Sequence, residues 1–229
     1  TYGNAQERLG PALQPYRRDV FLACKTEQRT KAEAWAQLQE SLRLLRTDYI
    51  DLYQLHAMTT LEEVDQVFAP DGAMAAFEEA RRQGLVRYLG FSAHSEAAAL
   101  ALMDRYPFDS ILFPFNYVTW HHGFGPRVLQ AAEEKGVARL ALKALARRPW
   151  HEDEPREWPK CWYRPVASFA EAQLALRFTL GLPITAAVPS GHPELLWWAC
   201  DIADKLAPLT PTEQEQLKIA ALELQPIFQ

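Results

Sequence analysis

The amino-acid sequence predicts an α/β fold and, within that class, a (β/α) barrel forming one domain over residues 1–229. Strand and helix patterns alternate from one end of the chain to the other, as in parallel sheets with helical crossovers. No GxGxxG motif follows a strand, which argues against a doubly wound dinucleotide-binding sheet. Polar and reactive side chains gather at the predicted carboxyl ends of the strands, where (β/α) barrels place their active sites.

The predicted helices are recognised by apolar residues spaced three or four apart and by the glycines that end them. Residues 31–45 carry such a stripe, formed by Ala34, Leu38, Leu42 and Leu45. Gly84 and Gly136 directly follow two other helical patterns, as helix-terminating glycines do. In chain order, helices are predicted over residues 5–13, 31–45, 72–83, 96–106, 127–135, 169–179, 193–205 and 212–224.

The predicted strands are short apolar runs rich in β-branched and aromatic residues. They cover residues 19–25, 49–56, 86–92, 110–116, 138–143 and 184–188, and residues 147–164 form a long irregular segment. Six strands make three quarters of an eight-stranded barrel and would leave open sheet edges. We therefore expect two further strands before Thr1, or from another chain. The absence of a starting Met agrees with a longer protein.

Composition narrows the function classes. The net charge is −5, and no Lys/Arg stripe or long apolar run is present, so neither nucleic acid nor membrane is an expected partner. The three cysteines, Cys24, Cys161 and Cys200, are far apart and lack CxxC spacing. That pattern argues against a disulfide framework or a zinc ribbon and favours a reducing compartment, so a cytoplasmic location is expected.

The side chains that follow the strands are the candidates for chemistry. In chain order they are Lys25, His56, Ser92, His94, Asn116, Lys143, Ser190 and His192. A lysine at the apolar end of a strand is unusual, because burying an ammonium is costly unless it is paired. We therefore favour a functional role for Lys25, with a solvent-facing lysine as the alternative.

Several segments resemble the aldo-keto reductases. Residues 2–10 (YGNAQERLG) match a family segment that carries a tyrosine, and residues 19–25 match its lysine-bearing strand. Residues 41–56 (SLRLLRTDYIDLYQLH) match a family signature closely, and residues 84–92 (GLVRYLGFS) match another. The resemblance covers essentially the whole chain and implies an eight-stranded barrel whose first two strands precede Thr1.

The resemblance also implies an activity, the reduction of an aldehyde or ketone to an alcohol by NAD(P)H. By motif, Tyr2 is the general acid, Lys25 assists it and His56 orients the substrate. A nearby ammonium lowers the pKa of a phenol, and a neutral histidine can donate a hydrogen bond to the substrate oxygen. The family's catalytic Asp would lie before Thr1.

Further residues are assigned to the cofactor. The resemblance implies that Ser92 and Asn116 hold the nicotinamide carboxamide. Many family members have an asparagine where this chain has Ala93, so one cofactor contact is either weakened or transferred to His94. Lys143 is a candidate for the pyrophosphate. The loop that contains Pro189, Ser190 and Gly191, with the helix N-terminus behind it, is the expected phosphate site. NADP(H) is favoured over NAD(H), although no Arg or Lys matches a site for the 2′-phosphate.

The expected substrate is a small carbonyl compound bound in an aromatic pocket. Trp120, His121 and Trp150 are the candidates, the last in an irregular segment of the kind that often forms a lid. A monomer or small homo-oligomer is expected. Two alternatives remain open: a non-catalytic binding or regulatory protein with the same fold, and a metal-dependent barrel hydrolase. No HxH motif supports the second, so no metal site is predicted.

Overall fold

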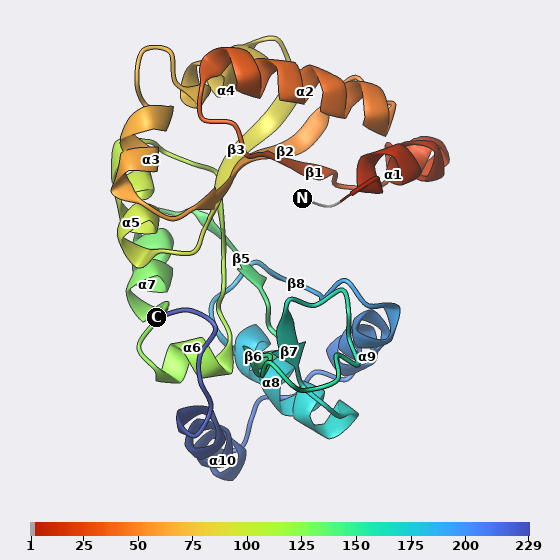
Figure 1. Cartoon of the computed structure of the whole chain (residues 1–229), viewed down its shortest axis with the longest axis vertical. Coiled ribbons are helices and arrows are strands. Elements are labelled where there is room, and N and C mark those ends of the chain that lie inside the picture. The colour runs from red at the N-terminus through yellow and green to blue at the C-terminus, as the bar shows by residue number, and fades with distance from the viewer. Residues whose placement is uncertain (1–2) are drawn as a thin grey trace. The chain divides into compact units, whose positions relative to one another are not determined.

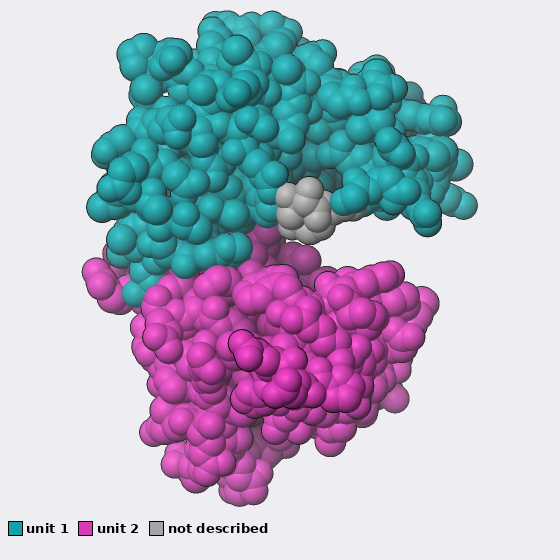
Figure 2. Space-filling model, viewed as in Figure 1, with its two compact units in different colours: residues 1–111 teal, residues 112–229 magenta. Residues whose placement is uncertain are grey.

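A computed structural model of the protein describes residues 3–229. The chain divides into two compact units, Thr1–Ile111 and Leu112–Gln229 (Figure 2). Strands and helices follow one another along both units, and Figure 1 labels most of them, numbered in chain order. Within the described residues, no helix is both long enough and apolar enough to cross a membrane. The predicted Tyr2 lies outside the described residues.

Unit 1 is built from parallel strands, each followed by at least one helix. Its elements are α1 (Ala5–Leu13), the short 3-10 helix η1 (Gln14–Tyr16), β1 (Ala23–Thr26), α2 (Lys31–Leu45), β2 (Ile50–Met58), α3 (Leu61–Val67), α4 (Ala73–Arg82), β3 (Val86–Ala93) and α5 (Glu96–Arg105). The next strand, β4 (Ser110–Phe113), begins in unit 1 and ends in unit 2. The helices predicted over residues 5–13 and 31–45 are confirmed to the residue.

The core of unit 1 follows the predicted helical stripe. Ala34, Leu38, Leu42 and Leu45 of α2 are all buried, as their spacing predicted. On the neighbouring strand β2, Tyr53 stacks at a tilt on Phe77 of α4, with the two ring centroids 4.9 Å apart. Burial of these large apolar groups is the main force that holds the helices on the sheet.

Strand β1 is shorter than the sequence predicted. The strand was expected over residues 19–25, but β1 starts only at Ala23. The reason is Asp51, a buried carboxylate on β2 that accepts a hydrogen bond from the backbone nitrogen of Leu22 at 2.9 Å. Arg17 and Arg87 form ion pairs with the same carboxylate at 3.0 and 2.9 Å. The N–H of Leu22 is therefore bonded to a side chain, although its carbonyl oxygen accepts from the backbone nitrogens of Asp51 and Leu52, and residues 17–19 form a turn.

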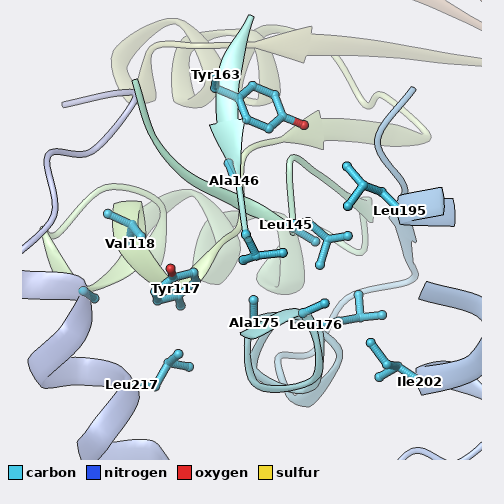
Figure 3. Close-up of a cluster of buried hydrophobic side chains, with 14 of the residues drawn as sticks. Tyr117, Val118, Leu145, Ala146, Tyr163, Ala175, Leu176, Leu195, Ile202 and Leu217 are labelled. Atoms are coloured by element: carbon cyan, nitrogen blue, oxygen red, sulfur yellow. The ribbon is translucent and has the colours of Figure 1, made fainter. Parts of the chain in front are cut away.

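Unit 2 contains short strands among larger helices. Its elements are α6 (Tyr117–His121), α7 (Pro126–Glu134), β5 (Ala138–Leu142), β6 (Ala146–Pro149), β7 (Tyr163–Pro165), α8 (Phe169–Gly181), β8 (Ala186–Val188), α9 (Pro193–Ala203) and α10 (Pro211–Leu222). Strands β5 and β8 pair in parallel, whereas β6 and β7 form an antiparallel pair. Figure 3 shows the buried apolar cluster of this unit, in which Tyr163, Leu176 and Ile202 come from three different elements.

Two predictions in unit 2 were wrong in detail. The strand predicted over residues 110–116 stops at Phe113, because Pro114 has no backbone N–H and Asn116 caps the unpredicted helix α6. The segment predicted to be irregular over residues 147–164 contains most of strands β6 and β7. Glu154 fixes the loop between them by accepting hydrogen bonds from Arg148 at 2.8 and 2.7 Å and from Arg164 at 3.0 Å. Ion-paired side chains organise this loop, which has no apolar periodicity to predict it.

Candidate active site

Lys25 and His56 lie at the carboxyl ends of the adjacent strands β1 and β2. The parallel register pairs Lys25 with Gln54, two residues before His56. Both side chains line one pocket of unit 1, with a volume of about 470 Å³, together with Glu27, Gln6 and Gln37. The structure therefore brings together two of the three residues predicted to be catalytic. The third, Tyr2, stays a prediction.

Lys25 lies in a partly buried environment. Burial is the main cause that lowers the pKa of its ammonium below the ordinary value. A lysine of this kind gives up its proton more readily than a solvent-exposed one. On the paired strand, Gln54 is buried and its amide nitrogen has no hydrogen-bond partner among the described residues.

His56 is held by a network of side chains that the sequence did not reveal. Its Nδ1 lies 3.2 Å from Oε1 of Glu27, and its carbonyl oxygen accepts a hydrogen bond from Arg29 at 2.7 Å. Arg29 is in turn paired with Glu63 of α3 at 2.9 Å. Burial and the nearby charge of Lys25 lower the pKa of His56, while Glu27 opposes this shift.

The backbone beside His56 has an unusual conformation. Ala57 adopts a φ of 52°, the left-handed region that non-glycine residues rarely occupy, and a register shift interrupts the β2–β3 ladder between Leu55 and Met58. The Ala57 N–H donates to Oγ of Ser92 on β3 at 2.8 Å. Ser92, predicted to contact the cofactor, thus supports the backbone next to His56, and its hydroxyl retains a proton to donate.

His94 follows β3, and its backbone nitrogen donates to the carbonyl oxygen of Met58 at 3.0 Å. This bond ties the residue after β3 to the end of β2. The two cofactor residues predicted in unit 1 are therefore bonded to the segment that follows His56, Ser92 through its hydroxyl oxygen and His94 through its backbone nitrogen.

Asn116 in unit 2 is completely buried and caps α6. Its Oδ1 accepts hydrogen bonds from the backbone nitrogens of Val118 and Thr119 at 3.1 and 3.0 Å. The amide nitrogen Nδ2 has no partner among the residues that the structure describes. A buried donor of this kind suits a carbonyl oxygen such as that of a carboxamide.

Lys143 follows β5 with a φ of 61°. Its Nζ lies 5.1 Å from the ring centroid of Trp162 and 4.5 Å from that of Phe228. These are distances at which a cation is attracted to an aromatic face. The lysine predicted to contact pyrophosphate is therefore held against aromatic rings of unit 2.

The loop predicted to bind phosphate, Pro189, Ser190 and Gly191, follows β8. Oγ of Ser190 lies 3.2 Å from the hydroxyl of Tyr163, and the buried site raises the pKa of that phenol to about 12. Helix α9 begins at Pro193 and has Glu194 in its first turn. A carboxylate there competes with an anionic ligand for the positive end of the helix.

Two residues predicted to contact substrate contribute to helix packing in unit 2. The rings of Trp120 and His121 lie 6.1 and 5.4 Å from that of Phe178 on α8, measured between centroids. His121 also lines a pocket of about 330 Å³ with Arg177 and Leu209, and burial lowers its pKa. Their role toward a substrate stays a prediction.

Trp150 contributes to the loop between β6 and β7. Its Nε1 donates to the carbonyl oxygen of Cys161 at 2.8 Å. The indole therefore braces the segment that the sequence suggested as a lid.

Within residues 3–229, no three His, Cys, Asp or Glu side chains lie close enough together to hold a metal ion.

The chain matches a known protein family over most of its length. The family model described as the aldo/keto reductase family matches residues 1–160. The chain belongs to this family. It is 36% identical over 102 residues to the uncharacterized oxidoreductase YqkF of Bacillus subtilis, covering 39% of this chain and 31% of that protein. It is 27% identical over 165 residues to the aldo-keto reductase YhdN of the same species, covering 64% of this chain and 45% of that protein. The chain thus spans less than half the length of these relatives.

Solved structures confirm the fold class. The holo form of aldo-keto reductase AKR11C1 from Bacillus halodurans aligns with 97% of this chain and 80% of its own, at 24% identity and a TM-score of 0.68. An aldo-keto reductase of Bombyx mori in complex with NADP aligns with 94% of this chain and 74% of its own, at 19% identity and a TM-score of 0.65. The predicted barrel of aldo-keto reductase type is therefore correct.

Proposed function

We propose that the protein is an oxidoreductase that reduces a small aldehyde or ketone to its alcohol with NAD(P)H. The observation that supports this most directly is the placement of Lys25 and His56 on one pocket at the ends of adjacent parallel strands. Membership of the aldo/keto reductase family supports the class of reaction.

The proposed roles follow from the chemistry of reduction. When bound, a nicotinamide cofactor would supply a hydride to the carbonyl carbon, and the carbonyl oxygen would then need a proton to become a hydroxyl. We assign the proton donation to Tyr2, on the strength of the resemblance of residues 2–10. The ammonium of Lys25 favours the phenolate that remains, and a hydrogen bond from His56 orients the carbonyl oxygen.

The residues assigned to the cofactor fit it unevenly. The buried amide nitrogen of Asn116 and the hydroxyl of Ser92 are donors suited to a carboxamide oxygen. The segment from Pro189 to Asp204 contains no Lys or Arg, and Glu194 adds negative charge in the first turn of α9. This segment does not favour a 2′-phosphate. We propose NADP(H) over NAD(H) because of the family resemblance and because one similar structure is in complex with NADP.

The lack of a cation between Pro189 and Asp204 also supports the alternative of a non-catalytic protein with this fold. Titration with NADPH and NADH, followed by fluorescence of the seven tryptophans, separates the two functions. A reductase shows saturable quenching with at least one cofactor and consumes it when an aldehyde is added. Absence of quenching with both cofactors contradicts the reductase proposal and favours the non-catalytic one.

A further inference from the structure

We propose that Glu27 is a positioning residue for His56. It keeps the proton of the neutral imidazole on Nδ1, so that Nε2 donates a hydrogen bond to a carbonyl oxygen only when the ring is doubly protonated. This inference rests on the proposed function and deepens it, because it replaces the neutral donor that the sequence suggested with a doubly protonated ring.

The assignment of the proton follows from the contact between the two side chains. Oε1 of Glu27 lies 3.2 Å from Nδ1 of His56. An ionised carboxylate has acceptors and no donor, so the hydrogen between these atoms belongs to Nδ1. A neutral imidazole has a single N–H, and its other nitrogen then carries a lone pair. In this state Nε2 accepts hydrogen bonds and cannot donate one.

The surroundings of His56 oppose a movement of its imidazole ring away from Glu27. Its side chain is only 12% exposed. Arg29 holds the carbonyl oxygen of His56 at 2.7 Å, and Glu63 holds Arg29 in turn. On the other side, the Ala57 N–H is bonded to Ser92. The backbone is therefore fixed at His56 and at the residue that follows it, while the ring itself is held by its burial and by the contact of Nδ1 with Glu27.

Charged groups from each neighbouring element determine when the second proton binds. Lys25 on β1 and Arg29 after it disfavour the imidazolium, as does burial, whereas Glu27 favours it. Glu63 of α3 acts through Arg29, and His94 follows β3. The net effect lowers the pKa of His56, so the doubly protonated form grows as the solution becomes acidic. The rate of carbonyl reduction should therefore rise as the pH falls. At higher pH, the lone pair on Nε2 can instead accept a hydrogen bond from the hydroxyl of an alcohol.

Nuclear magnetic resonance of protein labelled with ¹⁵N-histidine tests the inference without any cofactor. The six histidines are few enough to assign, with the His56 signals identified by their loss in His56→Asn. In the wild type, the neutral ring should carry its proton on Nδ1. Glu27→Ala should move the proton toward Nε2 and shift the titration to lower pH. Glu62→Gln, which removes an exposed carboxylate of α3, should change neither.

The pH profile of reduction gives a second readout. In the wild type, the rate should fall about tenfold for each pH unit above the His56 titration, because only the imidazolium donates. In Glu27→Ala the fall should be shallower, since the neutral Nε2–H tautomer can donate. A wild-type ring protonated on Nε2, or a tautomer unchanged in Glu27→Ala, overturns the inference. If the spectra agree but no variant reduces any carbonyl, the reductase proposal fails and the role of Glu27 in fixing the tautomer stands.

Discussion

At the scale of single residues, the candidate reaction centre depends on how the ends of β1 and β2 meet. Lys25 and His56 close apolar strand patterns and could be predicted, whereas Glu27 and Arg29, in the segment after β1, could not. Their importance depends on the register of β1 against β2, which brings a half-exposed carboxylate to the ring of His56. Residue type alone identifies Glu27 as one of many solvated acids, so only geometry distinguishes it.

Lys25→Met separates the catalytic role of the ammonium from a structural one. Folding a lysine into this environment is opposed by burial, so its removal should leave the melting temperature unchanged or higher. The rate of carbonyl reduction should fall by roughly 10²–10⁴-fold, the range for loss of assistance to proton transfer. Steady-state cofactor oxidation and thermal denaturation measure the two effects. A variant that keeps wild-type activity would show that Lys25 is not part of the reaction centre.

At the scale of elements, helices with a clear apolar stripe were predicted to within a residue or two. The short helices α3 and α6 were missed because seven and five residues carry too little periodicity. The start of β1 and the hairpin of β6 and β7 depend on the carboxylates of Asp51 and Glu154 and their arginine partners. Such long-range polar contacts leave no local pattern in the sequence.

Gly90 on β3 is required by the close approach of Ser110. A Cβ at this position would lie 2.4 Å from the hydroxyl oxygen of Ser110 and 2.8 Å from its carbonyl oxygen. Gly90→Ala should therefore destabilise the protein by roughly 1–3 kcal/mol in urea denaturation, the usual cost of overpacking. Gly181→Ala is the matched control, because nothing lies within 4 Å of its added Cβ. Equal stability of the two variants would refute the steric explanation.

Glu213 connects α10 to α8 through Arg177. Hydrogen bonds from the guanidinium, at 2.8 and 3.0 Å, and from Thr210 lower the pKa of this carboxyl to about 2. A carboxyl whose pKa is lower in the folded state stabilises the fold above its unfolded pKa of about 4.3, and this stabilisation is lost as the pH falls toward about 2.

Glu213→Gln should therefore reduce the free energy of unfolding at pH 7, and the difference from the wild type should shrink steadily below about pH 4. Urea denaturation at several pH values measures this dependence. Glu215→Gln, an exposed carboxylate on the same helix, serves as the control. A Glu213→Gln effect that is the same at pH 7 and pH 3 would argue against the ion pair as its cause.

At the scale of the whole molecule, the fold class could be predicted because alternation of strands and helices is a property of the entire chain. The family could be recognised because residues 41–56 carry a specific signature. The cofactor preference could not be derived, because the segment after β8 has no cation that would discriminate the 2′-phosphate. The substrate is equally undetermined by sequence, since Trp120 and Trp150 take part in packing within unit 2.

The most direct test of carbonyl reduction is isotope transfer from a cofactor deuterated at C4 of the nicotinamide, on the face from which hydride leaves. The purified protein is incubated with NADPH or NADH labelled in this way and a panel of aldehydes and ketones, and the products are analysed by mass spectrometry. We predict an alcohol with one deuterium on its carbinol carbon, formed by the wild type and greatly reduced with Lys25→Met. Unlabelled alcohol, or no alcohol from any carbonyl with either cofactor, would contradict the proposed function.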